Sequence, residues 1–88
     1  MKIKLHSKFR KAYKTRIAFN KKLVEQTVQR IALFQKNSKD PLLKDHGLTG
    51  AKRKLRSFSV TGDIRIVYMP VSDQEVLLMD IGSHNQVY

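Results

Sequence analysis

The sequence has 88 residues, 18 of them Lys or Arg and 7 Asp or Glu, so its formal net charge is +11. A chain of this length is expected to form one domain over residues 1–88 with a modest core. It has no cysteine, which excludes disulfides and Cys-ligated metal sites. No apolar run approaches the ~20 residues of a membrane span, and the charged start does not resemble a signal peptide. We therefore expect a soluble, cytoplasmic protein with no membrane partner.

The basic residues are unevenly distributed along the chain. Residues 1–24 contain nine Lys or Arg and no acid, whereas residues 66–88 contain three acids and no Lys or Arg. The simplest interpretation is a solvated surface that keeps the protein soluble. Such a large, one-sided excess favours binding to a polyanion, and nucleic acid is the commonest polyanion in a cytoplasm.

Alternation of lysines with apolar residues predicts a short strand over residues 1–5. Ser7 is then a candidate N-cap for an amphipathic helix with a basic outer face. The apolar positions of this helix recur at a spacing of about four residues: Phe9, Ala12, Tyr13 and Ile17.

Asn20 is a candidate cap for a second helix. One stripe of this helix is formed by Leu23, Val24, Thr27, Val28, Ile31 and Phe34. The short link at residues 18–20 predicts an antiparallel helical hairpin whose stripes contact each other and a sheet. Residues 40–41, Asp-Pro, favour one further helical turn that ends at Gly47.

From Leu55 onward the apolar period becomes two, which is typical of strands. Turn signals at residues 61–63 and 70–73 separate three strands, the last over residues 76–81. The expected fold class is therefore α+β, with the order βααβββ and an antiparallel sheet packed against the N-terminal helical hairpin.

Side chains suited to RNA chemistry fall in three segments outside the helices: His46, Asp63, Arg65, His84 and Tyr88. In metal-free RNA cleavage the ribose 2′-OH attacks the adjacent phosphate, so one group must take a proton and another must give one. Histidine does both near neutral pH. An arginine binds phosphate through its fork of donors, and an aromatic ring stacks on an unpaired base.

Each of these residues also has a structural explanation. Arg65 can be an ion-pair partner of Asp63 or Asp80, and Tyr88 can simply cover the sheet. His6 precedes the first helix and is interpreted as structural or incidental.

The segments H-G-L-T-G, D-I-R-I-V-Y and G-S-H-N-Q-V-Y, with the basic βαα start, resemble the RelE/ParE superfamily of bacterial toxins. The resemblance is closest to its YafQ-like branch of mRNA endonucleases and covers essentially the whole chain. It implies a RelE-like microbial RNase fold and the toxin of a type II toxin-antitoxin system. It also implies ribosome-dependent, metal-independent mRNA cleavage that needs no cofactor and inhibits translation. The implied partners are mRNA on the ribosome, ribosomal RNA and a cognate antitoxin.

The resemblance implies roles for the five candidate residues. His46 and His84 share the acid and base roles in an order left open, Asp63 orients a histidine or the 2′-OH, Arg65 stabilises phosphate charge, and Tyr88 stacks on a base. The neighbouring cations are expected to bind RNA: Lys52, Arg53, Lys54 and Arg56. Ser59 departs from the pattern, because members of this branch commonly carry another histidine there, so a three-histidine mechanism is not expected.

Two other functions are compatible with the same chain. One is a ParE-like inhibitor of DNA gyrase with the same fold, against which the two histidines argue. The other is an RNA-binding module without catalysis, which the serine at position 59 would suit.

Overall fold

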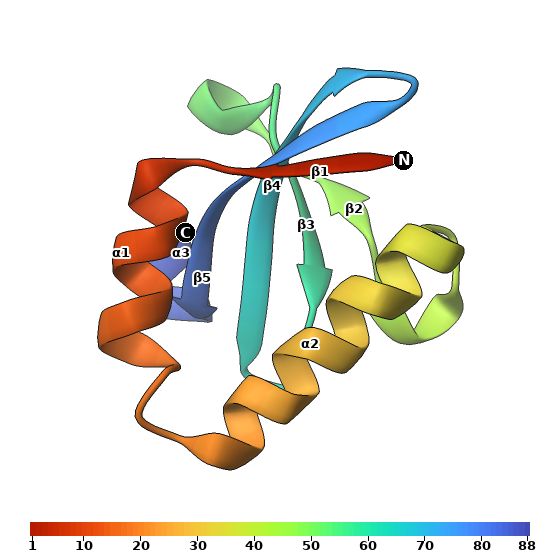
Figure 1. Cartoon of the computed structure of the whole chain (residues 1–88). Helices are drawn as coiled ribbons and strands as arrows, with labels where there is room; N and C mark the ends of the chain where they lie inside the picture. Colours follow the sequence, from red (N-terminus) through yellow and green to blue (C-terminus); the bar gives the residue numbers. More distant parts are fainter.

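The computed structural model describes all residues from 1 to 88, arranged as three α-helices and a five-stranded sheet (Figure 1). The elements in chain order are β1 (Lys2–Leu5), α1 (Ser7–Arg16), α2 (Lys21–Lys36), the 3₁₀ turn η1 (Pro41–Leu43), β2 (His46–Gly47), the 3₁₀ turn η2 (Gly50–Lys52), β3 (Arg56–Ser59), β4 (Ile64–Ser72), β5 (Glu75–Ser83) and α3 (His84–Val87). The strand order is β1-β5-β4-β3-β2, with β1 parallel to β5 and all other pairs antiparallel. The predicted α+β class and the final three-stranded meander are confirmed.

The two long helices begin at side-chain caps. Asn20 caps α2 as predicted, since its Oδ1 accepts a hydrogen bond of 3.1 Å from the Leu23 amide. The cap of α1 is His6, so the prediction of Ser7 was wrong by one residue. His6 keeps the extended backbone that leaves β1, and its Nδ1 accepts from the Lys8 amide at 3.0 Å.

Both long helices cover the same face of the sheet, where the core lies. Phe34 of α2 stacks on Phe58 of β3 with ring centroids 4.5 Å apart, and the edge of Tyr68 in β4 completes the aromatic group. Figure 1 shows α1 running beside β5, whereas α2 runs at a wide angle to α1. The two helices of the predicted hairpin are therefore splayed apart. Val28, predicted in the apolar stripe of α2, is 60% exposed, because it lies on the side of the helix that faces solvent.

The turn predicted from residues 40–41 forms, and Asp40 Oδ1 caps it by accepting from the Leu42 amide at 2.9 Å. It ends earlier than predicted, at Lys44, which has the left-handed backbone angles φ 50° and ψ 39°. Gly47 lies beyond it, in the edge strand β2.

The turn predicted at residues 70–73 begins later, because β4 continues through Pro70 to Ser72. Proline has no N–H to give to a strand ladder. Here it lies beside an irregularity in the β4–β5 register, between Pro70 and Ser72, where the regular ladder is interrupted. Strand β5 is also longer than predicted and runs directly into the unpredicted turn α3. None of the helices is long and apolar enough to cross a bilayer.

Candidate active site

Two of the predicted residues, His46 and Tyr88, meet on the face of the sheet opposite the aromatic core. His46 in β2 is paired with Ser57 in β3, and paired residues project to the same side. Ser57 precedes the core residue Phe58, so its side chain points to the opposite face. The Tyr88 hydroxyl donates to Ser57 Oγ at 2.5 Å, which brings the last residue of the chain to the same place.

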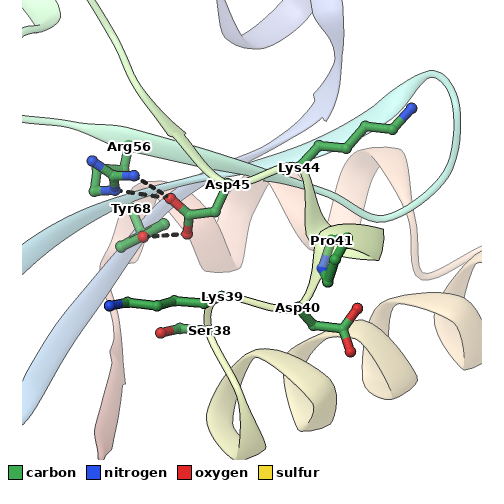
Figure 2. Close-up of a pocket in the computed structure, with 8 residues that line it drawn as sticks. All are labelled: Ser38, Lys39, Asp40, Pro41, Lys44, Asp45, Arg56 and Tyr68. Carbon is green, nitrogen blue, oxygen red and sulfur yellow. Dashed lines mark hydrogen bonds and ion pairs between the residues drawn. The ribbon is translucent and has the colours of Figure 1, made fainter.

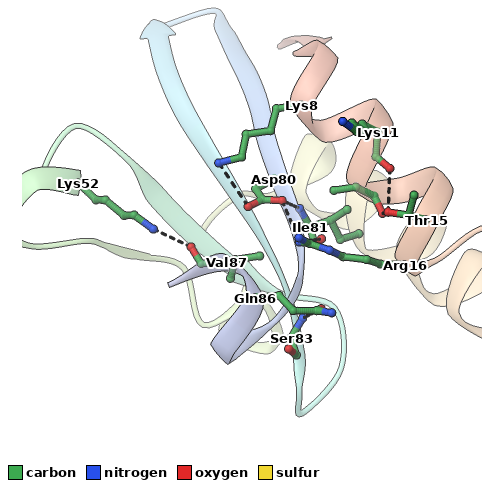
Figure 3. A network of polar contacts seen from close by, with 11 residues as sticks. Lys8, Lys11, Thr15, Arg16, Lys52, Asp80, Ile81, Ser83, Gln86 and Val87 are labelled. Atoms are coloured by element: carbon green, nitrogen blue, oxygen red, sulfur yellow. Dashed lines mark hydrogen bonds and ion pairs between the residues drawn. The ribbon is translucent and has the colours of Figure 1, made fainter.

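His46 and Tyr88 together line a hollow with a volume of about 450 Å³. Its other lining residues belong to the segment that follows His46: Gly47, Leu48, Thr49 and Lys52. Lys52 Nζ donates to the Val87 carbonyl at 2.8 Å, so this segment is joined to the C-terminal turn (Figure 3). The two segments that line the hollow, the one after His46 and the C-terminal turn, are therefore bonded to each other.

His84 packs against the Tyr88 ring. These two residues are four apart in the turn α3, a spacing that places side chains over one another. Their rings meet edge to face, with centroids 4.6 Å apart and planes at 85°. The structure thus brings both histidines to one tyrosine.

The glycine of the G-S-H segment lies where two side chains pack closely against the backbone. A Cβ on Gly82 would lie 2.6 Å from Gln86 Oε1 and 2.9 Å from Arg16 Nη1. Gln86 Oε1 accepts from the Ser83 amide at 2.7 Å, the contact that turns the chain out of β5 into α3. Figure 3 shows Arg16 reaching from α1 to Asp80 and Ile81, just before Gly82 in the chain. The absence of a side chain at Gly82 therefore allows the turn that carries His84.

Arg65 projects to the face of the site, since it is paired with Ser59 in β3, two residues after Ser57, and it is half-buried. No ion pair joins Arg65 to Asp63 or Asp80, so that structural alternative was wrong. Asp80 instead pairs with Arg16 at 3.2 Å and Lys8 at 3.7 Å (Figure 3). Arg65 therefore keeps its guanidinium free for an anion.

Asp63, like Arg65, makes no side-chain contact with the other predicted catalytic residues. It lies exposed in the loop between β3 and β4, and its carboxylate makes no hydrogen bond or ion pair. Ser59, at the position of the missing histidine, is buried, and its hydroxyl donates to the Thr61 carbonyl at 2.6 Å. This serine thus closes the β3–β4 turn and does not line the hollow.

The four cations predicted to bind RNA have different surroundings. Arg53 and Lys54 are exposed and have no side-chain partner, and Lys52 uses one of its three donors on Val87. Arg56 projects to the opposite face, toward its β4 partner Tyr68.

There Arg56 binds Asp45, with Nε and Nη2 at 2.8 and 2.7 Å from Oδ1 (Figure 2). The Tyr68 hydroxyl donates to the other oxygen, Oδ2, at 2.5 Å. The hydrogen bond with Asp45 raises the pKa of Arg56 above its usual value. Burial, and then the Asp45 hydrogen bond, raise the pKa of Tyr68 well above 10. Asp45 and Tyr68 were not singled out from the sequence, although Asp45 directly precedes His46.

No group of three or more His, Asp or Glu side chains lies close enough together to hold a metal ion. The site is instead a hollow lined by His46, Lys52 and Tyr88, with His84 packed against Tyr88 and the exposed cations Arg53 and Lys54 directly after Lys52 in the chain. Such a set can exchange protons and bind phosphate.

The fold is that of bacterial toxins of the RelE/ParE superfamily. Over 98% of this chain and 96% of the other, it matches Escherichia coli YafQ at a TM-score of 0.82 and 19% identity. The E. coli DinJ-YafQ complex matches with the same coverage, at 0.79 and 20%. A YoeB/ParE toxin from Agrobacterium tumefaciens matches over 96% and 99% of the chains, at 0.78 and 21%. No curated protein sequence matches significantly.

The family model described as "Bacterial toxin of type II toxin-antitoxin system, YafQ" matches residues 1–88. The chain therefore belongs to the YafQ toxin family, and it is the toxin of a type II toxin-antitoxin system. We expect its partner to be a cognate antitoxin, the kind of partner found in the DinJ-YafQ complex.

Proposed function

We propose that this toxin is an endoribonuclease that cleaves mRNA on translating ribosomes and so inhibits translation. The observation that carries this proposal is that Tyr88 lines an open hollow together with His46 and packs edge to face on His84. Two imidazoles that serve one substrate can divide the roles of base and acid. Tyr88 is 36% exposed, and its ring can stack on a base of a single RNA strand.

The proposed reaction needs no group beyond the RNA and the protein. One histidine takes the proton of the 2′-OH, and the 2′-oxygen forms a bond to the adjacent phosphorus. The bond from phosphorus to the 5′-oxygen breaks, and the other histidine gives that oxygen a proton. The products are a 2′,3′-cyclic phosphate and a 5′-OH. Arg65 stabilises charge on the phosphoryl oxygens, and Asp63 orients the 2′-OH or a histidine once RNA is bound.

The remaining cations fit docking on the ribosome. Arg53 and Lys54 directly follow Lys52 of the hollow and have no side-chain partner, and residues 1–24 carry nine further Lys and Arg on β1, α1 and the start of α2. Ribosomal RNA is a dense polyanion, so association is expected to weaken as salt rises. The same charge favours an antitoxin that is acidic where it binds the toxin and that becomes ordered on binding.

The test is a purified translation reaction with one defined mRNA, followed by mapping of the cleaved ends. We expect cleavage at the ribosome, a 2′,3′-cyclic phosphate on the upstream fragment, and no cleavage when the attacking nucleotide is 2′-deoxy. His46→Ala and His84→Ala should each lower the cleavage rate by roughly 10² to 10⁴. Unchanged cleavage in both variants would contradict the assignment of the histidines.

Two other results would replace the proposal. Intact mRNA together with trapped gyrase–DNA cleavage complexes would assign the toxin to gyrase. Intact mRNA with salt-sensitive binding to RNA alone would make it a binding module. Cleavage that leaves a 3′-OH and a 5′-phosphate would exclude attack by the 2′-OH.

A further inference from the structure

The backbone just before His46 has an unusual conformation. Lys44 is the only residue other than glycine with a positive φ, and a left-handed conformation is unfavourable for a residue that bears a side chain. Such conformations persist only where the surrounding contacts hold them. Those contacts are therefore expected next to Lys44.

The Lys44 carbonyl is in direct contact with the His46 ring. His46 Nδ1 lies 2.9 Å from this oxygen. Since a carbonyl can only accept, Nδ1 must carry the proton, which leaves Nε2 as the nitrogen that can exchange a proton with a substrate. The conformation of Lys44 thus fixes both the orientation of the ring and the nitrogen it presents.

Asp45 supplies the contacts that hold this segment. Its side chain is only 11% exposed, and its two oxygens accept from Arg56 and Tyr68 (Figure 2). Both donors are on strands inside the sheet, and Tyr68 is 4% exposed in the core. The carboxylate therefore ties the loop between Lys44 and His46 to the rigid part of the fold.

We infer that Asp45 is a positioning residue for His46, held by Arg56 and Tyr68 so that His46 Nε2 faces the hollow where RNA would bind. This inference rests on the proposed nuclease function. It changes the expected role of Arg56 from binding RNA to positioning, because its Nε and Nη2 are engaged by Asp45 on the face away from the hollow. Asp45 then affects catalysis without touching the substrate.

The kinetic test uses the full toxin and a ribosome-bound mRNA under single-turnover conditions, with the toxin concentration varied. Asp45→Asn should lower the maximal cleavage rate about 10- to 100-fold and leave the half-saturating concentration unchanged. Tyr68→Phe keeps the buried ring and removes only the hydroxyl, so it should lower the same rate to a smaller degree. Arg53→Ala combined with Lys54→Ala should instead raise the half-saturating concentration.

Asp40→Asn is the matched control. Figure 2 shows a second hollow, separate from that of His46 and Tyr88, which is lined by both Asp45 and Asp40. The same substitution at Asp40 leaves an asparagine that can still cap η1. We expect cleavage by this variant at the wild-type rate. A thermal melt of each variant shows whether it is folded at the assay temperature.

A second readout does not depend on cleavage. Long-range ¹H–¹⁵N spectra of the free toxin report which ring nitrogen of a neutral histidine carries the proton. We expect the Nδ1–H form for His46 in the wild type and an increase of the Nε2–H form in Asp45→Asn, with His84 unchanged in both.

The outcomes separate the two hypotheses. Wild-type toxin that leaves mRNA intact overturns the proposed function, and the inference with it. Wild-type cleavage together with a folded Asp45→Asn that cleaves equally fast, or that only binds more weakly, overturns the inference alone. An unchanged His46 tautomer in that variant also overturns it.

Discussion

The hydroxyl of Tyr88 donates a hydrogen bond of 2.5 Å to Ser57 Oγ, which joins the end of the chain to the middle of β3. Ser57 is fully buried, whereas Tyr88 is 36% exposed. The two partners therefore do not depend on this bond equally. Without Ser57 the phenol can turn to water, but without the phenol the serine hydroxyl is left buried and unsatisfied.

Tyr88→Phe should consequently destabilise the fold by about 1 to 3 kcal/mol, the usual cost of an unsatisfied buried polar group. Ser57→Ala should cost less, and the double variant should cost less than the sum of the two. Urea unfolding of the four proteins measures these differences. Equal stability of Tyr88→Phe and wild type would show that the bond does not hold the C-terminus.

Two substitutions at Tyr88 distinguish the contribution of ring stacking to cleavage from that of the hydroxyl hydrogen bond. If the ring stacks on a base, Tyr88→Phe retains most of the cleavage, while Tyr88→Ala loses roughly 1 to 3 kcal/mol of binding, or about 5- to 150-fold in half-saturating concentration. Primer extension on ribosome-bound mRNA measures both. Identical losses in the two variants would point to the hydroxyl instead of the ring.

A third prediction concerns Gly82. An added methyl group would displace the ends of the Gln86 and Arg16 side chains from their hydrogen bonds, so Gly82→Ala should cost about 0.5 to 1.5 kcal/mol of stability. Gly62→Ala is the matched control, because its Cβ would meet nothing within 4 Å and its φ is not positive. This control should be neutral or slightly stabilising. Equal melting temperatures for the two variants would contradict the packing argument.

Stability should fall at alkaline pH because of Tyr68. Its pKa is raised in the folded state, so the unfolded chain loses this proton first, from about pH 10 upward. The contribution of the neutral phenol is present in full below that pH and is lost as pH rises toward the folded pKa. The difference in unfolding free energy between wild type and Tyr68→Phe should therefore shrink between pH 9 and 11 (about the range in which a free tyrosine ionises). A constant difference over this range would contradict the predicted loss of stability on ionisation of Tyr68.

The division of roles between the two histidines has a direct chemical test. If the 5′-oxygen of the scissile bond is replaced by sulfur, the leaving group needs no proton. Of His46→Ala and His84→Ala, the variant that lacks the acid should then recover cleavage, and the other should stay slow. Recovery of both, or of neither, would contradict a two-histidine mechanism.

Local patterns were sufficient to predict most elements of the fold. The apolar period located α1, α2 and the three terminal strands, and Asn20 was recognised as a cap from its residue type. The errors arose where tertiary contacts determine the local structure. Pro70 is tolerated within β4 because the register is irregular there, and His6 replaces Ser7 as a cap because of the path of the chain out of β1.

The site could be predicted only in part for a similar reason. Motif resemblance picked out His46, His84 and Tyr88, and the sheet register and the turn α3 bring them together. The contacts of Asp45 with Arg56 and Tyr68 span 11 and 23 residues of sequence and depend on the strand register. No local pattern encodes them. Arg56 was consequently grouped with the RNA-binding cations on charge alone.

The placement of β1 determines when the toxin can complete its fold. β1 precedes the other four strands in the chain, but its only partner in the sheet is β5, with Lys2 opposite Glu75 and the His6 amide bonded to the Leu78 carbonyl at 2.9 Å. Since a strand cannot pair before its partner exists, the β1–β5 ladder forms only after β5 has been made. This contact between segments about 70 residues apart is therefore expected to form late in folding.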